Sequence, residues 1–306
     1  MSIKILTVQN LKKYYPTVKA VDDISFEIEM GTVFTLLGPN GAGKTTTLEI
    51  IEGIKKADDG KIIFLGEEMK HVSEEAKQKI GVSLQSTNFI PHLKVKEVFE
   101  LFASFFKKSL PVEQILDFVS LEEKKNDFVE KLSGGQKQRV AIGCALINDP
   151  EMIFLDEPTT GLDPQARRNI WGIIEHLKKQ GKTVFLTTHY MEEAQKLSDM
   201  VCIMDHGKII AMDTPTGHIK KLGERNYVEF SAELEQTEIT ELNSWDVEEV
   251  EIEGEKIIIP TKSLHMILEK LLSWAKTKGL DLNDISVRQP NLEDVFLSLT
   301  GRRLRD

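Results

Sequence analysis

A glycine-rich stretch at residues 38–45 constrains this chain more than any other feature. It fits the pattern G-x-x-x-x-G-K-[ST] and consists of Gly38, Pro39, Asn40, Gly41, Ala42, Gly43, Lys44 and Thr45. The apolar run before it, residues 33–37, predicts a buried strand, and residues 46–51 predict a helix. Glycines let backbone N–H groups wrap a polyphosphate, and a helix N-terminus favours anions. We therefore expect a phosphate-binding loop in which Lys44 reaches the outer phosphates and Thr45 ligates Mg²⁺.

Composition and charge narrow the class of protein. A chain of 306 residues is long enough for one large domain and a small one, and 41 % hydrophobic with 29 % charged residues is typical of a globular protein. The net charge is −10, and 17 acidic against 9 basic residues lie from Asn226 onward. This acidic balance disfavours a non-specific nucleic-acid binder.

Cysteine usage and hydropathy point to a chain without a membrane span. The two cysteines, Cys144 and Cys202, lie in apolar runs and fit reduced, buried thiols better than a disulfide or a zinc site. The first residues lack the apolar core of a signal peptide, and no apolar run approaches the roughly 18 residues needed to cross a bilayer. If the protein works at a membrane, another chain must supply the membrane part.

Hydrophobic periodicity predicts an α/β fold with a parallel sheet that helices cover on both faces. An antiparallel β subdomain and a helical subdomain, at about residues 90–145, are expected beside that sheet. The polar residues at the carboxyl ends of the buried strands would then bind the ligand. The predicted strands are residues 3–8, 24–28, 60–66, 81–85, 152–155, 183–187, 201–204 and 208–211, and the predicted helices lie within residues 95–129, 134–145 and 165–179.

The pattern changes after Gly223 and predicts a second domain, so we expect domains at residues 1–225 and 226–306. The order of elements is βαββαβ followed by a helix, which is typical of a small ferredoxin-like α+β domain. Its predicted elements are residues 227–230, 235–243, 246–253, 255–259, 263–278, 285–287 and 291–299.

Two further stretches carry chemistry. The strand at residues 152–155 runs into Asp156 and Glu157, which places one carboxylate for Mg²⁺ and a second to polarise a water for attack on a phosphate. Residues 132–136 read Leu-Ser-Gly-Gly-Gln, where Ser133 is a good N-cap and Gln136 completes a capping box. That second helix N-terminus, with Gly134 and Gly135 baring its N–H groups, offers a second anion site.

These motifs, in this order over about residues 3–220, resemble the nucleotide-binding subunit of an ABC transporter, and residues 132–136 match the family's signature. The resemblance implies a P-loop NTPase fold that binds ATP and Mg²⁺ at Gly38–Thr46, with Lys44 and Glu157 among the catalytic groups. It also implies a head-to-tail pair with a second copy or a homologous subunit. In that pair, Ser133, Gly134, Gly135 and Gln136 of one chain would cover the γ-phosphate held by the other.

The same resemblance adds roles for single residues. Tyr15 is similar to the aromatic residue that stacks on adenine, with the neighbouring Tyr14 as the alternative. Gln85 is similar to the glutamine that touches Mg²⁺ and senses the membrane partner, so the Mg²⁺ ligands would be Thr45, Gln85 and Asp156. Asp163 is similar to the aspartate that links two subunits, and His189 to the switch histidine that contacts the γ-phosphate.

A narrower resemblance, to drug-resistance-type exporter ATPases, rests on residues 85–89 and on the ending Gln-Pro-Asn-Leu-Glu-Asp-Val-Phe-Leu at residues 289–297. It implies an ATP-hydrolysing subunit at the cytoplasmic face of the cell membrane, held there by separate permease chains. The chain departs from the family's pattern at three positions: Pro16-Thr17 replaces Gly-Asp, and Lys94 replaces Thr. The alternatives are a non-transport ABC ATPase acting on ribosomes or nucleic acid, and an importer subunit. The transported substrate is not encoded in any motif of this chain.

Overall fold

The computed structural model describes residues 3–301, except for residues 70–72, 84–88, 246 and 248–249. Contacts divide the chain into two compact units, with the boundary between Pro215 and Thr216, whereas the sequence pattern places it at 225/226. No helix built from the described residues has both the length and the apolar character needed to span a bilayer.

A six-stranded sheet in the order β10-β9-β3-β8-β7-β6 is the centre of the first unit. Strands β6, β7, β8, β3 and β9 run parallel, and β10 closes the edge as an antiparallel hairpin with β9. The bounds are β3 Val33–Leu37, β6 Ile80–Ser83, β7 Met152–Asp156, β8 Thr183–Thr188, β9 Met200–Asp205 and β10 Lys208–Asp213.

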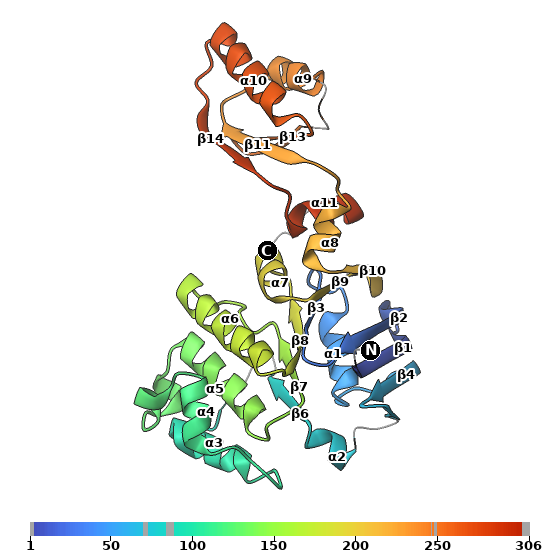
Figure 1. The fold of residues 1–306 in the computed structure, drawn as a ribbon, viewed down its shortest axis with the longest axis vertical. Helices are drawn as coiled ribbons and strands as arrows, with labels where there is room; N and C mark the ends of the chain where they lie inside the picture. Colours follow the sequence, from blue (N-terminus) through green and yellow to red (C-terminus); the bar gives the residue numbers. More distant parts are fainter. Residues whose placement is uncertain (1–2, 70–72, 84–88, 246, 248–249, 302–306) are drawn as a thin grey trace. The chain divides into compact units, whose positions relative to one another are not determined.

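Side chains of the central strands alternate between two hydrophobic clusters, one on each face of the sheet. Ile153 and Leu155 of β7 pack against helices, while Met152 and Phe154 face the antiparallel sheet and α1. Figure 1 shows α5 and α6 on one side of the central strands and α1 on the other. The helices of this unit are α1 Lys44–Ile51, α2 Glu74–Lys77, α3 Val95–Ala103, α4 Val112–Phe118, α5 Gly134–Leu146, α6 Pro164–Lys179 and α7 Met191–Leu197, with 3₁₀ turns at Glu122–Lys124 and Val129–Lys131.

A four-stranded antiparallel sheet in the order β2-β1-β4-β5 completes the first unit. Its bounds are β1 Lys4–Tyr15, β2 Val18–Glu29, β4 Asp59–Phe64 and β5 Glu67–Glu68. The first two strands are much longer than the predicted residues 3–8 and 24–28. Asn10 and Asp23 adopt positive φ values of 49° and 63°, and the β1–β2 register shifts between Val8 and Leu11. Such irregularities interrupt the alternation of apolar and polar residues on which the prediction depends.

The second unit contains the ferredoxin-like arrangement. Its sheet has the order β12-β13-β11-β14 with every pair antiparallel, which is the strand order of a split βαβ fold. Its own cluster of apolar residues includes Val228, Phe230 and Leu271, and Trp245 and Trp274 meet edge to face at 5.8 Å. The bounds are α8 Pro215–Lys220, β11 Asn226–Ser231, α9 Gln236–Asn243, β12 Glu251–Glu253, β13 Lys256–Thr261, α10 Leu264–Lys278, β14 Asn283–Arg288 and α11 Leu292–Thr300.

The motif at residues 289–297 has a clear local structure. Asn291 caps α11 and forms a capping box with Asp294. The Asp294 carboxylate also accepts two hydrogen bonds from Arg288, at 2.7 and 3.0 Å. Arg288 stacks over the Tyr227 ring at 4.2 Å and pairs with Glu229. The motif therefore fastens the start of α11 to the sheet of the second unit.

Candidate active site

The phosphate loop follows β3, the strand between β8 and β9, and leads directly into α1. Its glycines are required by geometry. Gly43, the N-cap of α1, has φ 106°, and a Cβ there would lie 2.1 Å from the Ala20 carbonyl oxygen; at Gly38 it would lie 2.1 Å from the Met204 carbonyl oxygen. Only glycine permits such positive φ angles and close backbone approaches. The loop thus has the strand–loop–helix context that the sequence predicts.

Lys44 lies beneath this loop and is almost fully buried, with 3 % of its surface exposed. Its Nζ donates to the carbonyl oxygens of Gly38, at 2.8 Å, and Pro39, at 3.1 Å, and lies 3.2 Å from Glu157 Oε1. Burial lowers the pKa of Lys44, although the ion pair with Glu157 opposes that effect. The ammonium group is thereby held at the base of the loop.

Thr45 and Asp156 form a pair of oxygen donors across the sheet edge. The Thr45 hydroxyl donates to Asp156 Oδ1 at 3.3 Å, and the Thr187 hydroxyl donates to the same oxygen. Burial raises the pKa of Asp156, and these two hydrogen bonds counteract the rise. A hydroxyl and a carboxylate side by side are the hard oxygen ligands that Mg²⁺ prefers, so the residues present fit that ion.

Glu157 lies where three of the predicted catalytic groups meet. Its Oε1 pairs with Lys44, while its Oε2 lies 3.1 Å from His189 Nδ1 and accepts a hydrogen bond from the Thr160 hydroxyl at 3.1 Å. The His189 hydrogen bond and the Lys44 charge outweigh burial and lower the pKa of Glu157 to about 2. Glu157 is therefore a carboxylate throughout the neutral range.

Strand order explains this convergence. Because β3, β8 and β7 are parallel neighbours, their carboxyl ends meet at one edge, with Leu37 opposite Thr188 and Asp156 opposite Thr187. No motif of the sequence marks Thr187, whose hydroxyl also accepts a hydrogen bond from the Glu157 N–H at 3.0 Å. The available signal was a run of threonines ending a buried strand just before His189.

The other predicted site residues lie apart from this cluster. Ser133 and Gln136 form the predicted capping box, with bonds of 3.3 and 2.9 Å, and a Cβ at Gly135 would meet the Ala166 side chain. Across the described chain, no hydrogen bond joins residues 133–136 to the phosphate loop. Asp163 caps α6 by accepting from Gln165 and Ala166, each at 2.9 Å. The start of α5, at residues 133–136, therefore packs beside α6.

The two candidate adenine-stacking residues differ in their anchoring. The Tyr14 hydroxyl donates to Asp22 at 2.7 Å, and Lys19 lies over its ring, so its orientation is fixed within the β1–β2 hairpin. Tyr15 is 41 % exposed at the end of β1. Gln85 lies outside the described residues. Tyr14 is 40 % exposed, and Lys13 lies over the Tyr15 ring at 5.7 Å, so the geometry does not separate the two candidates.

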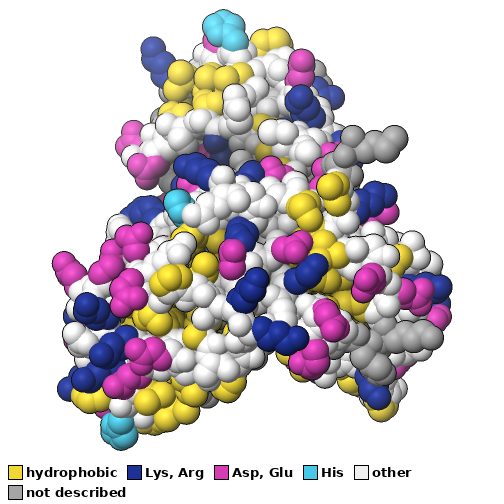
Figure 2. Space-filling model, turned by 60° about the horizontal axis from the view of Figure 1, so that its bottom comes forward, with side chains coloured by type: hydrophobic (Ala, Val, Ile, Leu, Met, Phe, Trp, Pro, Cys, Tyr) yellow, Lys and Arg dark blue, Asp and Glu magenta, His cyan; other side chains and the backbone are white. Residues whose placement is uncertain are grey.

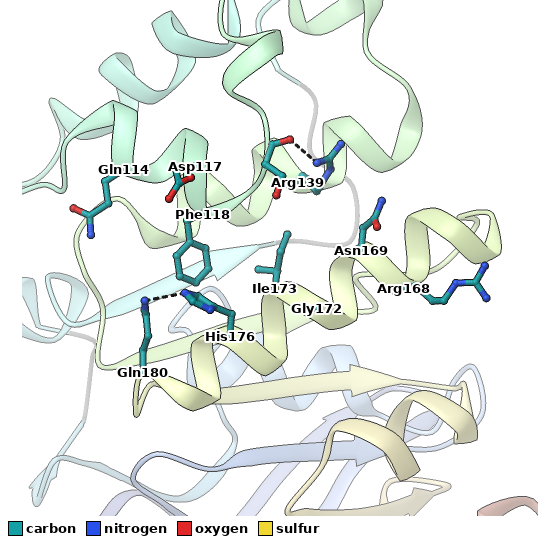
Figure 3. A pocket seen from close by; sticks show the side chains of 11 residues that line it. Gln114, Asp117, Phe118, Arg139, Arg168, Asn169, Gly172, Ile173, His176 and Gln180 are labelled. Atoms are coloured by element: carbon teal, nitrogen blue, oxygen red, sulfur yellow. Dashed lines mark hydrogen bonds between the residues drawn. The ribbon is translucent and has the colours of Figure 1, made fainter.

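A groove of about 600 Å³ lies elsewhere, between α4, α5 and α6. In Figure 3 the Phe118 ring points toward His176, which Gln180 also contacts, and Arg139 bonds the backbone after α4. None of the residues that line the groove belongs to the phosphate loop or to the cluster around Glu157. The groove marks the joint between the helical subdomain and α6.

These features define a P-loop nucleoside-triphosphatase: a glycine loop before a helix, a buried lysine, and paired acids at the end of a neighbouring strand. The helical subdomain, with its capped signature helix, defines a cassette of that class. A family model described as ABC transporter matches residues 21–160.

Whole-length relatives extend this match. The Nod factor export ATP-binding protein I of Ralstonia nicotianae is 38 % identical over 100 % of this chain and 96 % of its own length. The linearmycin resistance ATP-binding protein LnrL of Bacillus subtilis is 35 % identical over 99 % of this chain and 100 % of its own. The chain therefore belongs to the ABC transporter family, among the ATP-binding subunits of exporters, and the non-transport alternative is not favoured.

Solved structures agree with this assignment. An ATP-binding cassette of an ABC transporter in its ADP conformation has a TM-score of 0.63 and 30 % identity, over 70 % of this chain and 92 % of that chain. A dimeric bacterial ABC transporter cassette has a TM-score of 0.61 and 27 % identity, over 68 % and 98 %, and the same cassette is also known bound to ADP and Pi after hydrolysis. The chain has the P-loop NTPase fold, and it is an ATPase.

Proposed function

We propose that this chain is the motor subunit of a membrane exporter, and that ATP-driven closure of a pair of such chains drives efflux through a separate permease. The observation that carries the proposal is the incomplete site. Lys44, Asp156, Glu157 and His189 converge on one sheet edge, while the capped helix start at Ser133 lies against α6 of the same chain. A head-to-tail partner would supply that second anion site.

Each residue of the cluster has a defined part in this proposal. Lys44 leaves Glu157 and binds the outer phosphates, and the N–H groups of the loop bind the inner ones. Thr45 and Asp156 would hold Mg²⁺, with Gln85 as the further ligand that the resemblance implies, and the ion would supply charge neutralisation for the phosphates. Freed from Lys44, Glu157 orients the attacking water, and His189 contacts the γ-phosphate and holds Glu157 in place.

The pKa of Glu157 favours an orienting role. A carboxylate with a pKa of about 2 is a weak base at neutral pH, because general bases work best with a pKa near the working pH. Withdrawal of Lys44 toward the phosphates removes one cause of that low pKa. Glu157 is then more basic with ATP bound than without it.

The substitution Glu157→Gln tests the proposal. We expect turnover to fall by about 10²–10⁴-fold, with ATP binding retained and an ATP-bound dimer trapped. Phosphate release, nucleotide affinity and light scattering measure these three properties. Glu192→Gln, at an exposed position of α7, is the matched control and should behave like the wild type. Wild-type turnover in Glu157→Gln would refute the assigned role.

We place the protein at the cytoplasmic face of the membrane, held by its permease. The face drawn in Figure 2 supports a protein partner over a nucleic acid, because its Lys and Arg side chains are interspersed with Asp and Glu rather than gathered in one basic stripe. Purification from membranes should recover a polytopic partner that contacts the segment from Gln85 to Lys94. Salt-dependent RNA binding without such a partner would contradict the proposal.

We also propose an accessory role for the C-terminal unit in dimer stability or regulation, since no catalytic constellation is found among its described residues. Cutting the chain after Gly223 should leave ATP binding intact and alter dimerisation or coupled activity. A second cut, after Pro215, is needed because α8 clusters with the C-terminal unit and its His218 is buried. If both truncated chains dimerise and turn over ATP as the full chain does, the role is wrong.

A further inference from the structure

A buried carboxylate, Glu193 on α7, joins three segments around the active site. The residue is fully buried, and its Oε1 accepts hydrogen bonds from the Thr159 hydroxyl and the Trp171 indole N–H, each at 2.9 Å. Thr159 lies in the loop after Glu157, and Trp171 lies on α6. A single oxygen atom thus fastens the loop that carries Glu157 to both α6 and α7.

Two cation–ring contacts extend this connection along the same face of α6. Arg167, four residues before Trp171, stacks on the Tyr190 ring at 4.3 Å, and Lys196 lies over the Trp171 ring at 4.9 Å. We call these residues, with Glu193 and Thr159, the α6–α7 seam. The seam begins one turn after Asp163, which caps α6, and ends on the helix that follows His189.

Both partners of the His189–Glu157 contact are attached to this seam. On one side, Thr160 holds Glu157 at 3.1 Å, and Thr159 bonds Glu193. On the other side, His189 packs against the Tyr190 ring, with ring centres 4.2 Å apart, just before α7. Glu157 itself has a φ of 45°, a backbone conformation that persists only where its surroundings enforce it.

We propose that Glu193 is a positioning residue for ATP hydrolysis, because its two hydrogen bonds fix the α6–α7 seam and thereby hold His189 against Glu157. The inference rests on the roles proposed above for Glu157 and His189. A small displacement of a catalytic group costs rate without costing substrate affinity, since the phosphate loop itself is untouched. A purely structural position in this core would suit an apolar side chain better, because a buried carboxylate carries a desolvation cost.

The test compares variants that keep or remove the acceptor atom. Glu193→Gln retains an amide oxygen that both donors can reach, whereas Glu193→Ala leaves the Thr159 and Trp171 donors unpaired. We expect the kcat of Glu193→Ala to fall at least about tenfold while the KM for ATP stays within about twofold. Glu193→Gln should keep more than half of the wild-type kcat.

Two matched comparisons separate positioning from general destabilisation. Leu197→Ala, in the buried core on the same helix, should lower the melting temperature and leave kcat unchanged. The double variant Thr159→Val/Trp171→Phe removes both donors but keeps the carboxylate, so it should lose kcat as Glu193→Ala does. It also provides the measurement if Glu193→Ala does not fold.

Three results would overturn the inference. The first is a wild-type kcat in Glu193→Ala, and the second is a loss of kcat in Glu193→Gln as large as that in Glu193→Ala. The third is the same loss of kcat in Leu197→Ala when the melting temperatures of Leu197→Ala and Glu193→Ala are equal. Glu157→Gln, measured in parallel, keeps the two proposals apart. If that variant turns over ATP normally, the proposed roles of Glu157 and His189 fail. If it is inactive while Glu193→Ala is normal, only the positioning role of Glu193 fails.

Discussion

At the scale of single residues, Glu157 connects the electrostatics of the site to the stability of the fold. Its hydrogen bond from His189 and its ion pair with Lys44 keep it ionised well below the ordinary Glu pKa of 4.5. A carboxyl group with a lowered folded-state pKa stabilises the protein above its unfolded pKa. That contribution is lost as the pH falls from about 4.5 to about 2.

This linkage predicts a pH-dependent difference between the wild type and Glu157→Gln. Without nucleotide, the wild type should be more stable by up to about 3 kcal/mol at pH 7, and the gap should narrow as the pH falls below 4.5. Urea unfolding at several pH values between 7 and 3 measures it. A gap that stays constant with pH would contradict the assigned pKa, and Glu192→Gln should show no such trend.

Substitution by alanine should have different effects at two glycines of the phosphate loop, Gly43 and Gly41. Gly43→Ala brings its Cβ to 2.1 Å from the Ala20 carbonyl oxygen, so the backbone must move and ATP affinity should fall about a hundredfold or more. Gly41→Ala meets nothing within 4 Å, and its φ of 80° should cost only about 1–2 kcal/mol of stability. Nucleotide titration and thermal unfolding compare them. Equal effects would show that strain alone, without the backbone clash, decides both.

At the scale of elements, α6 is the helix through which the parts of the first unit meet. Asp163 caps its start, and Arg167 stacks on Tyr190, the N-cap of α7. Trp171 donates to Glu193 of α7, and His176 meets Phe118 in the groove of Figure 3. The hydrophobic face of α6 packs in the same cluster as α3, α4 and α5. A change in α6 should therefore affect both α7 and the helical subdomain.

Glycines inside two helices give a matched prediction. Gly172 of α6 faces open space, so Gly172→Ala should stabilise the fold by about 0.5–1 kcal/mol through helix propensity. Gly143 of α5 faces the Phe99 ring, 2.7 Å from an added Cβ, so Gly143→Ala should destabilise by about 1–3 kcal/mol. Denaturant unfolding gives both values. Equal signs for the two variants would contradict the packing described for α5.

At the scale of the whole molecule, the chain has two compact units with separate hydrophobic cores. The phosphate loop and its partners all belong to the first unit. Ligand binding stabilises only the state that binds, by about 2.7 kcal/mol at a hundredfold excess over Kd. ATP should therefore raise the midpoint of the first unit and leave that of the second unchanged.

Tryptophan fluorescence can follow the two units separately. Trp171 is buried in the first unit, and Trp245 and Trp274 belong to the second. In Trp171→Phe, the fluorescence change on heating should follow the second unit, and ATP with Mg²⁺ should not shift its midpoint. In Trp245→Phe/Trp274→Phe, the fluorescence change should follow the first unit, and ATP with Mg²⁺ should raise its midpoint. A single shared transition that shifts in both variants would show that the units unfold together.

Much of the fold and of the site follows from local sequence. The phosphate loop is contiguous, and its glycines, lysine and threonine act within eight residues, so their spacing alone defines the cradle. The run into Asp156 and Glu157, the capping box at Ser133 and the βαββαβ order of the second unit are also local patterns, and the structure contains each of them. These elements form because period, capping and turn chemistry act over a few residues.

Only the tertiary structure decided which of these pieces meet. Lys44 reaches Glu157, and Thr187 reaches Asp156, because β3, β8 and β7 are neighbours, and strand order is not encoded in the spacing of any motif. In the sequence, Glu193 is one of several charged residues on a short helix; only the structure shows that it is buried and bonded to Thr159 and Trp171. The sequence by itself determined the contiguous pattern of the phosphate loop and the paired acids that follow β7. The packing of distant segments determined that Glu157 lies beside Lys44 and His189 and that Glu193 joins Thr159 to Trp171, because these contacts depend on partners far apart along the chain.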